Sequence, residues 1–117
     1  MWLVDGQRLW LAQRPATGVW AGLWTLPLFH SAPALEATLV SWPGRGETLP
    51  TIEHALTHFD WTLEPLRHTL PTRLSAKRRA AIEAALESAV GKGRWFSRDE
   101  ALALGLPAPI RKLISSR

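Results

Sequence analysis

Two short runs near the middle of the chain narrow the possible folds more than any other feature. In TIEHAL and FDWTLEPL, large side chains fall at every second position: Ile52, His54 and Leu56, and then Phe59, Trp61 and Leu63. A period of two predicts strands and argues against a helix. Because only a few residues separate the runs, the sequence predicts two strands joined as a hairpin, with Thr57 and His58 at its tip.

The hairpin decides how His54 and His58 are interpreted. On a helix, two histidines four residues apart can hold zinc. On a hairpin they lie in and beside a strand, and no further ligand type sits nearby. A catalytic zinc site needs three protein ligands. We therefore expect no metal site here, and we expect His54 to support the hairpin tip.

Turn and capping signals predict the remaining elements. Asp5-Gly6 predicts a two-residue turn between strands in WLVDGQRLWLAQ, and Ser75 and Gly91 delimit the one long helix. Ser97 and Glu100 form a capping-box pattern before a helix that ends at Gly105. The other expected elements are a short strand in 23–29, a helix in 31–42 capped by Ser31, a loop over 43–50, a strand at 94–96 and a helix from 108.

Hairpins, strands and late helices together predict an α+β fold with helices packed on a sheet. A chain of 117 residues predicts a single domain, residues 1–117. No cysteine, signal peptide or long apolar segment occurs, so we expect a cytoplasmic protein that does not enter a membrane, and a monomer.

Positive charge is concentrated in the second half of the chain. Residues 1–65 contain three Lys or Arg against six Asp or Glu, whereas residues 66–117 contain eleven against four. A net charge of −3 is thus followed by one of +7. A basic half suits a partner that carries phosphates, nucleic acid above all, although a solvated helix surface explains the same charge.

No motif for acid–base, nucleophilic or phosphate chemistry is present. The adjacent pair Asp99-Glu100 is explained as the acidic first turn of a helix. Glu83 and Glu87 follow Arg79 on the long helix and predict a salt-bridged solvent face. We therefore expect no catalytic residues in this chain.

Seven tryptophans are present, and the core is the default place for most of them. Trp20 and Trp24 differ, because they lie in a Gly-rich loop. These two rings can present aromatic faces to a partner domain or to nucleic-acid bases.

Three stretches of the chain resemble the C-terminal domain of MutY-type adenine DNA glycosylases. LAQRPATGVWAGLWTLP, HALTHFDWTLEPL and RWFSRDEALALGLPAPIRKLI occur in the same order as in that family and span most of the chain. The resemblance implies a Nudix-like fold, a mixed β-sheet flanked by helices. It also implies recognition of 8-oxoguanine opposite mispaired adenine in double-stranded DNA, as part of base excision repair. The catalytic carboxylates and the four-iron, four-sulfur cluster of the family belong to the N-terminal catalytic domain, the other expected partner, so the resemblance implies no cofactor here.

The resemblance also indicates the residues that bind DNA. The recognition loop of the family usually reads Phe-Ser-His, and the matching residues are Leu56, Thr57 and His58. Guanine presents a bare N7 acceptor, whereas 8-oxoguanine presents an N7–H donor, and a hydroxyl can accept from that donor. His58 can bind a phosphate or hold the loop. Leu56 replaces the aromatic wedge of the family, and aliphatic side chains also open base steps.

Other functions remain open at the level of sequence. Nudix hydrolases carry a glutamate-rich helix that binds magnesium, but the matching PALEATLVSW has only Glu36, which disfavours pyrophosphate hydrolysis. A general nucleic-acid-binding module is supported by the basic half, and a protein-interaction domain by Trp20 and Trp24. The long basic helix over 75–90 departs from the family, and no function follows from it.

Overall fold

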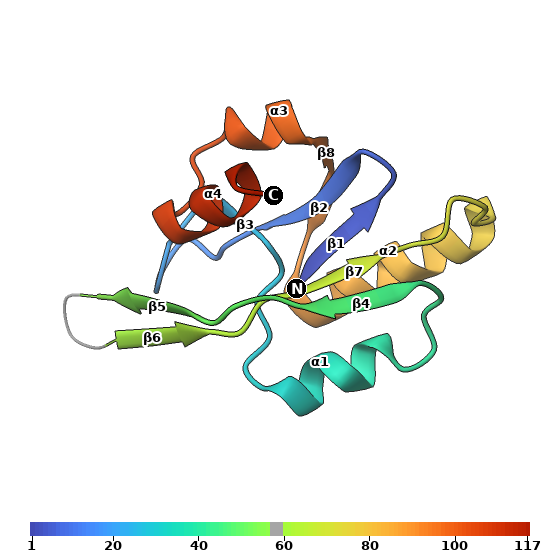
Figure 1. Ribbon diagram of the computed structural model, residues 1–117, viewed down its shortest axis with the longest axis horizontal. Helices are drawn as coiled ribbons and strands as arrows, with labels where there is room; N and C mark the ends of the chain where they lie inside the picture. The colour runs from blue at the N-terminus through green and yellow to red at the C-terminus, as the bar shows by residue number, and fades with distance from the viewer. Residues whose placement is uncertain (57–59) are drawn as a thin grey trace.

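The computed structural model describes residues 1–56 and 60–117, and these form a mixed sheet with helices on both faces (Figure 1). The strands are β1 (Trp2–Asp5), β2 (Arg8–Gln13), β3 (Trp24–Thr25), β4 (Arg45–Thr48), β5 (Ile52–Ala55), β6 (Asp60–Leu63), β7 (Leu66–Thr69) and β8 (Gly93–Ser97). The helices are α1 (Ala32–Leu39), α2 (Ala76–Val90), α3 (Arg98–Leu102) and α4 (Ala108–Ser115). The predicted α+β class is confirmed.

The main sheet has the strand order β3-β2-β1-β7-β4, and β8 pairs with β2. Only the pairing of β1 with β7 is parallel within the described residues. Strand β8 pairs with β2 from Arg8 to Ala12, so β1 and β3 share the other edge of β2. The parallel pair makes this a mixed sheet.

Alternation along β1 and β2 divides the core between the two faces of the sheet. Leu3 and Trp10 face the side covered by α1 and α2, where they pack with Ile82 and Leu86. The residues that alternate with these along each strand face the side covered by α3 and α4. They are Trp2, Leu9 and Leu11, and they pack with Phe96, Ile110, Leu113 and Ile114. The sheet is therefore the middle layer of three, as a strand with apolar residues on both faces requires.

The first hairpin is confirmed, but its turn lies one residue later than predicted. Asp5 pairs with Arg8, so the turn consists of Gly6 and Gln7, and Gly6 has φ of +63°. Glycine at the first central position is typical of a type II′ turn. Asp5 instead stays in β1, where its buried carboxylate accepts a hydrogen bond from Arg79 Nε at 2.8 Å.

Residues 43–50, predicted as a loop, contain strand β4, which pairs with β7. The sequence of β4 shows no alternation because all four of its residues are exposed. Gly44 has φ of +116° and lies so close to the backbone oxygen of Thr69 that a Cβ has no room there. A glycine is thus needed for the chain to enter this strand. Strand β7 was not predicted at all.

Helix ends agree well with the capping signals. The Ser75 side chain accepts a hydrogen bond from Arg78 N at the start of α2, and Gly91, with φ of +92°, follows its end. Ser31 caps α1 in the same way. The Ser97–Glu100 capping box is formed, and its hydrogen bonds from Ser97 lower the pKa of Glu100. The short strand at 23–29 is reduced to Trp24–Thr25, and α3 ends at Leu102, before Gly105.

The solvent face predicted for α2 is instead used in packing against the sheet. Arg79 binds Asp5 of β1, and Glu83 accepts a hydrogen bond from Trp95 Nε1 at 2.9 Å. No ion pair joins Arg79 to Glu83 or Glu87 in the described structure. The predicted salt bridges along this face were therefore wrong, because Arg79 and Glu83 have partners far away in the sequence, while Glu87 is exposed. No described helix has the length and apolar character needed to cross a membrane.

Candidate functional site

Strands β5 and β6 form a two-stranded sheet of their own, separate from the main sheet. They pair in register from Ile52 with Leu63 to Ala55 with Asp60, and Figure 1 shows the pair extending away from the body of the molecule. The hairpin predicted from the alternating runs is confirmed. His54 lies in β5, as expected, so the structure contradicts the zinc-binding helix.

The two faces of this hairpin also follow the predicted alternation. One face is half-buried and packs toward the body: Ile52, His54, Trp61 and Leu63. The other face is exposed, with Glu53, Ala55, Asp60 and Thr62. Ile52 and Leu63 pack against the core cluster under α3 and α4. The base of the hairpin is thus held by the core, while its far end depends on other contacts.

Trp20 supplies those contacts. Its ring lies edge-on to Trp61, with ring centroids 5.0 Å apart, and 5.8 Å from the ring of His54. Its φ of +56° makes it the one described non-glycine residue with a positive φ, and a bulky residue keeps this conformation only where its surroundings enforce it. The ring thus braces the β5–β6 hairpin, and because Trp20 is half-buried, its predicted role as a face for a partner stays a prediction.

A short hydrogen-bonded loop holds Trp20 in this position. The backbone N–H of Arg14 donates to the oxygen of Leu23 at 2.8 Å, and Gly22 N donates to the oxygen of Pro15 at 2.9 Å. Trp24, which follows the loop, packs edge-on to Phe96 with centroids 5.2 Å apart, and Arg94 lies over its ring. Trp24 thus belongs to the margin of the core, and its predicted role as a partner surface also stays a prediction.

The predicted recognition residues follow β5 in the sequence. Leu56 directly follows β5 and is half-buried. Thr57 and His58 lie outside the described residues, so their predicted roles stay predictions. His54 contacts the anchoring ring of Trp20, which agrees with a supporting role in the strand.

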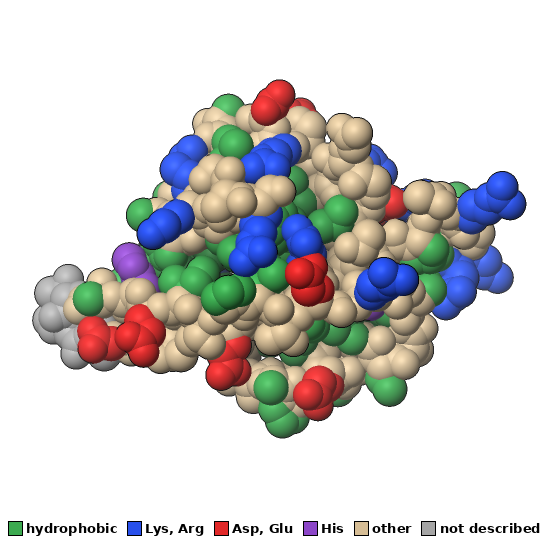
Figure 2. Space-filling model, viewed as in Figure 1, with side chains coloured by type: hydrophobic (Ala, Val, Ile, Leu, Met, Phe, Trp, Pro, Cys, Tyr) green, Lys and Arg blue, Asp and Glu red, His purple; other side chains and the backbone are tan. Residues whose placement is uncertain are grey.

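Charge differs sharply between the hairpin and the neighbouring helix α4. Figure 2 shows Asp and Glu side chains along the hairpin and Lys and Arg side chains over α4. Exposed carboxylates on the hairpin are Glu53, Asp60 and Glu64, and exposed cations at the end of α4 are Lys112 and Arg117. This contrast in charge was not predicted, although the cations among the last seven residues, 111–117, indicated a basic end of the chain.

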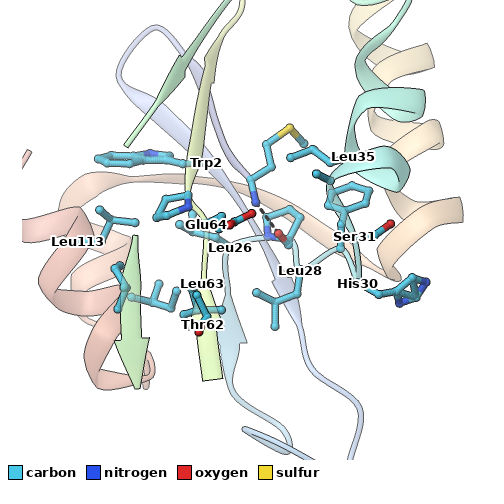
Figure 3. Close-up of a pocket in the computed structure, with 17 residues that line it drawn as sticks. Trp2, Leu26, Leu28, His30, Ser31, Leu35, Thr62, Leu63, Glu64 and Leu113 are labelled. Carbon is cyan, nitrogen blue, oxygen red and sulfur yellow. Dashed lines mark hydrogen bonds between the residues drawn. The ribbon is translucent and has the colours of Figure 1, made fainter. Parts of the chain in front are cut away.

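A cavity of about 210 Å³ lies between the start of α1, the end of β6 and α4 (Figure 3). Its walls are mostly apolar, with Trp2, Leu26, Leu35 and Leu113 among them, and Glu64 is its one acidic residue. At its edge the Met1 amine donates a hydrogen bond to the oxygen of Pro27 at 2.7 Å. Burial lowers the pKa of this amine from 8.0 to about 5. One carboxylate does not make a multi-carboxylate magnesium site.

The described residues also contain no other ready-made metal site. No three His, Cys, Asp or Glu side chains of this part of the chain gather where they could hold an ion. Glu36, the one carboxylate on α1, is exposed and does not line the cavity.

The mixed sheet between helices, with a hairpin projecting beside it, defines an α+β domain whose described residues assemble no carboxylate centre. Comparison with protein families then gives the relationship. A family model described as NUDIX domain matches residues 1–116, and the chain belongs to that family. The match confirms the expected Nudix-like fold.

Proposed function

We propose that this domain recognises 8-oxoguanine opposite mispaired adenine in double-stranded DNA, as the lesion-recognition part of a MutY-type adenine DNA glycosylase. The observation that carries the proposal is the β5–β6 hairpin, which stands apart from the main sheet and is braced by Trp20. It leads directly to Leu56, Thr57 and His58, the residues that match the recognition loop of that family.

Each of the three residues has a role that suits its chemistry. Leu56 opens the base step beside the lesion, as inserted aliphatic side chains do. The Thr57 hydroxyl accepts the N7–H of 8-oxoguanine, a donor that guanine lacks at this position. His58 binds a neighbouring phosphate or fixes the loop. The Trp20 brace serves this chemistry by limiting the conformational freedom that the loop loses on binding.

Adenine removal belongs, in this proposal, to the N-terminal catalytic domain of the same protein. That domain supplies the catalytic carboxylates and carries the iron–sulfur cluster, for which this chain has no cysteine ligand. The present domain contributes selectivity. Its affinity is higher for DNA with an 8-oxoguanine:adenine mispair than for DNA with a guanine:adenine mispair.

Pyrophosphate hydrolysis is the second candidate, because it is the chemistry suggested by a Nudix domain. It requires several carboxylates around magnesium, and α1 supplies only Glu36. We therefore expect the domain to leave nucleoside diphosphate derivatives intact in the presence of magnesium. Release of phosphate or nucleoside monophosphate at enzyme-like rates would show instead that the domain is a hydrolase.

The proposal is tested by joining this chain to the catalytic domain of an adenine DNA glycosylase. Single-turnover adenine removal is measured opposite 8-oxoguanine and opposite guanine, with and without the present domain. We expect the domain to raise the ratio of the two rates in favour of 8-oxoguanine. A ratio that does not change on adding the domain contradicts the proposal and leaves a general nucleic-acid-binding module as the alternative.

A further inference from the structure

Two hollows lie on either side of the C-terminal half of α4. The β5–α4 hollow, about 470 Å³, is lined by Glu53, His54, Pro109, Lys112 and Arg117 among others. The β1–α4 hollow, about 340 Å³, lies beside the turn of the first hairpin and is lined by Arg8, Arg67, Arg98 and Arg117 among others. Arg117 lines both hollows, and we call the two hollows together the groove beside α4.

Cations dominate this groove. The β1–α4 hollow is lined by four arginines and by no carboxylate of the described residues. Among the described residues that line the β5–α4 hollow, Glu53 is the one acidic residue, and Lys112 and Arg117 line it too. We call four cations of the groove the cationic track: Lys112, Arg117, Arg98 and Arg67. A concave surface with charge of one sign focuses the electric field and attracts ions of the opposite sign.

Two of these arginines, Arg67 and Arg98, are already held in place. Arg67 donates to Glu47 Oε2 at 2.6 Å and lies over the ring of Trp2, 5.2 Å from its centroid. Arg98 donates to the backbone oxygen of Ser115 at 2.8 Å. The guanidinium has five donors, so each of these contacts leaves others free.

Arg8 also lines the β1–α4 hollow, but its guanidinium lies over the ring of Trp95, on the sheet face covered by α1 and α2, so it is not counted in the track. Side chains that are ordered before binding lose less entropy when a ligand arrives. The cationic track is therefore better prepared for an anion than a set of freely moving surface lysines.

We propose that the cationic track binds the phosphodiester backbone of the DNA strand next to the base inspected by the β5–β6 hairpin. The choice of duplex DNA rests on the proposed function. The polyanion is inferred from the cations that line the groove, and β5 forms one wall of it, so a ligand of the hairpin also passes the groove. Asp60 and Glu64 line neither hollow, and Glu53 is the hairpin carboxylate that a strand along α4 meets.

The test reverses two charges of the cationic track, Lys112→Glu together with Arg117→Glu. The matched control is Arg73→Glu together with Lys77→Glu, which changes the net charge equally at two exposed residues that line neither hollow. The dissociation constant of the chain is measured by fluorescence anisotropy for short duplexes with an 8-oxoguanine:adenine or a guanine:adenine mispair, at several salt concentrations. Circular dichroism and thermal unfolding check the fold of both variants, and Lys112→Gln with Arg117→Gln replaces the reversal if that variant unfolds.

We expect the track variant to bind both duplexes about tenfold more weakly at low salt, while the control stays within about twofold of the original chain. The slope of log affinity against log salt should fall by about 1.8, since each lost phosphate contact contributes roughly 0.9. The preference between the duplexes should stay unchanged, because phosphate contacts carry no direct sequence information.

Equal weakening in the track and control variants, or no binding of either duplex at low salt, overturns the proposal. Binding of labelled polyglutamate by a chain that binds neither duplex also overturns the proposal, and it points to an acidic protein partner. Failure of the proposed function has a different signature. If the original chain binds both duplexes equally while the track variant still loses affinity, the cationic track stands and lesion recognition fails.

Discussion

Replacing Trp20 with alanine should lower the free energy of unfolding by about 3 kcal/mol and loosen the β5–β6 hairpin more than any other part of the fold. The hairpin has no third strand beside it in the described structure, and an isolated two-stranded sheet is marginal in water. The edge-on contact of Trp20 with Trp61, at 5.0 Å, is its main support away from the core. Chemical denaturation gives the global loss, and amide hydrogen exchange gives its distribution along the chain.

Trp42 provides a matched control for the same truncation. It is also half-buried, but it packs against the core beneath α1 and α2, near His68. Trp42→Ala should reduce stability without a selective increase of exchange in β5 and β6. If the amides of these strands exchange at the same relative rate in the Trp20 and Trp42 variants, Trp20 is not the anchor of the hairpin.

The free amine of Met1 should make the stability of this chain rise with pH between about 5 and 8. Burial lowers the pKa of the amine from 8.0 to about 5 in the folded chain. In this window the unfolded chain binds a proton that the folded chain lacks, so protonation favours unfolding and stability increases with pH. A difference of about three pKa units corresponds to about 4 kcal/mol. Denaturant unfolding at a series of pH values measures the effect.

Acetylation of the same amine is the control for this prediction. The acetylated nitrogen keeps one N–H, which can still donate to the oxygen of Pro27, but it no longer titrates. Histidines and carboxylates titrate alike in both forms, so the difference between the two pH curves isolates Met1. Parallel curves from pH 5 to pH 8 would show that the amine is hydrated in the folded chain.

Local signals predicted the local structure of this chain well. The caps of α2 and the Ser97–Glu100 capping box depend on residues three or four apart, and both formed as expected. The β5–β6 hairpin was equally predictable, because one face of each strand is half-buried and its alternation is visible. The α+β class followed from these elements together.

Features that depend on distant partners could not be predicted in the same way. Strand β4 is exposed at every residue, so only its pairing with β7 identifies it as a strand. Trp20 lies more than thirty residues before His54 and Trp61, and no local pattern connects them. The sequence placed an excess of positive charge in the second half, but it did not show that Arg8 joins Arg67, Arg98 and Arg117 in one groove.

Recognition of 8-oxoguanine by the hairpin tip is the central claim, and substitution of Thr57 tests it most directly. Thr57→Val keeps the shape and the strand preference of the residue but removes the hydroxyl. Loss of a hydrogen bond to a buried lesion edge costs about 1–3 kcal/mol, or roughly ten- to a hundredfold.

The measurement is the single-turnover rate of adenine removal by this chain joined to the catalytic domain of an adenine DNA glycosylase, compared between the original chain and Thr57→Val on both mispairs. We expect the rate opposite 8-oxoguanine to fall by roughly ten- to a hundredfold and the rate opposite guanine to change little, because guanine has no N7–H to donate. Equal losses on the two mispairs would contradict the account, since Thr57 would then support the loop without distinguishing the lesion.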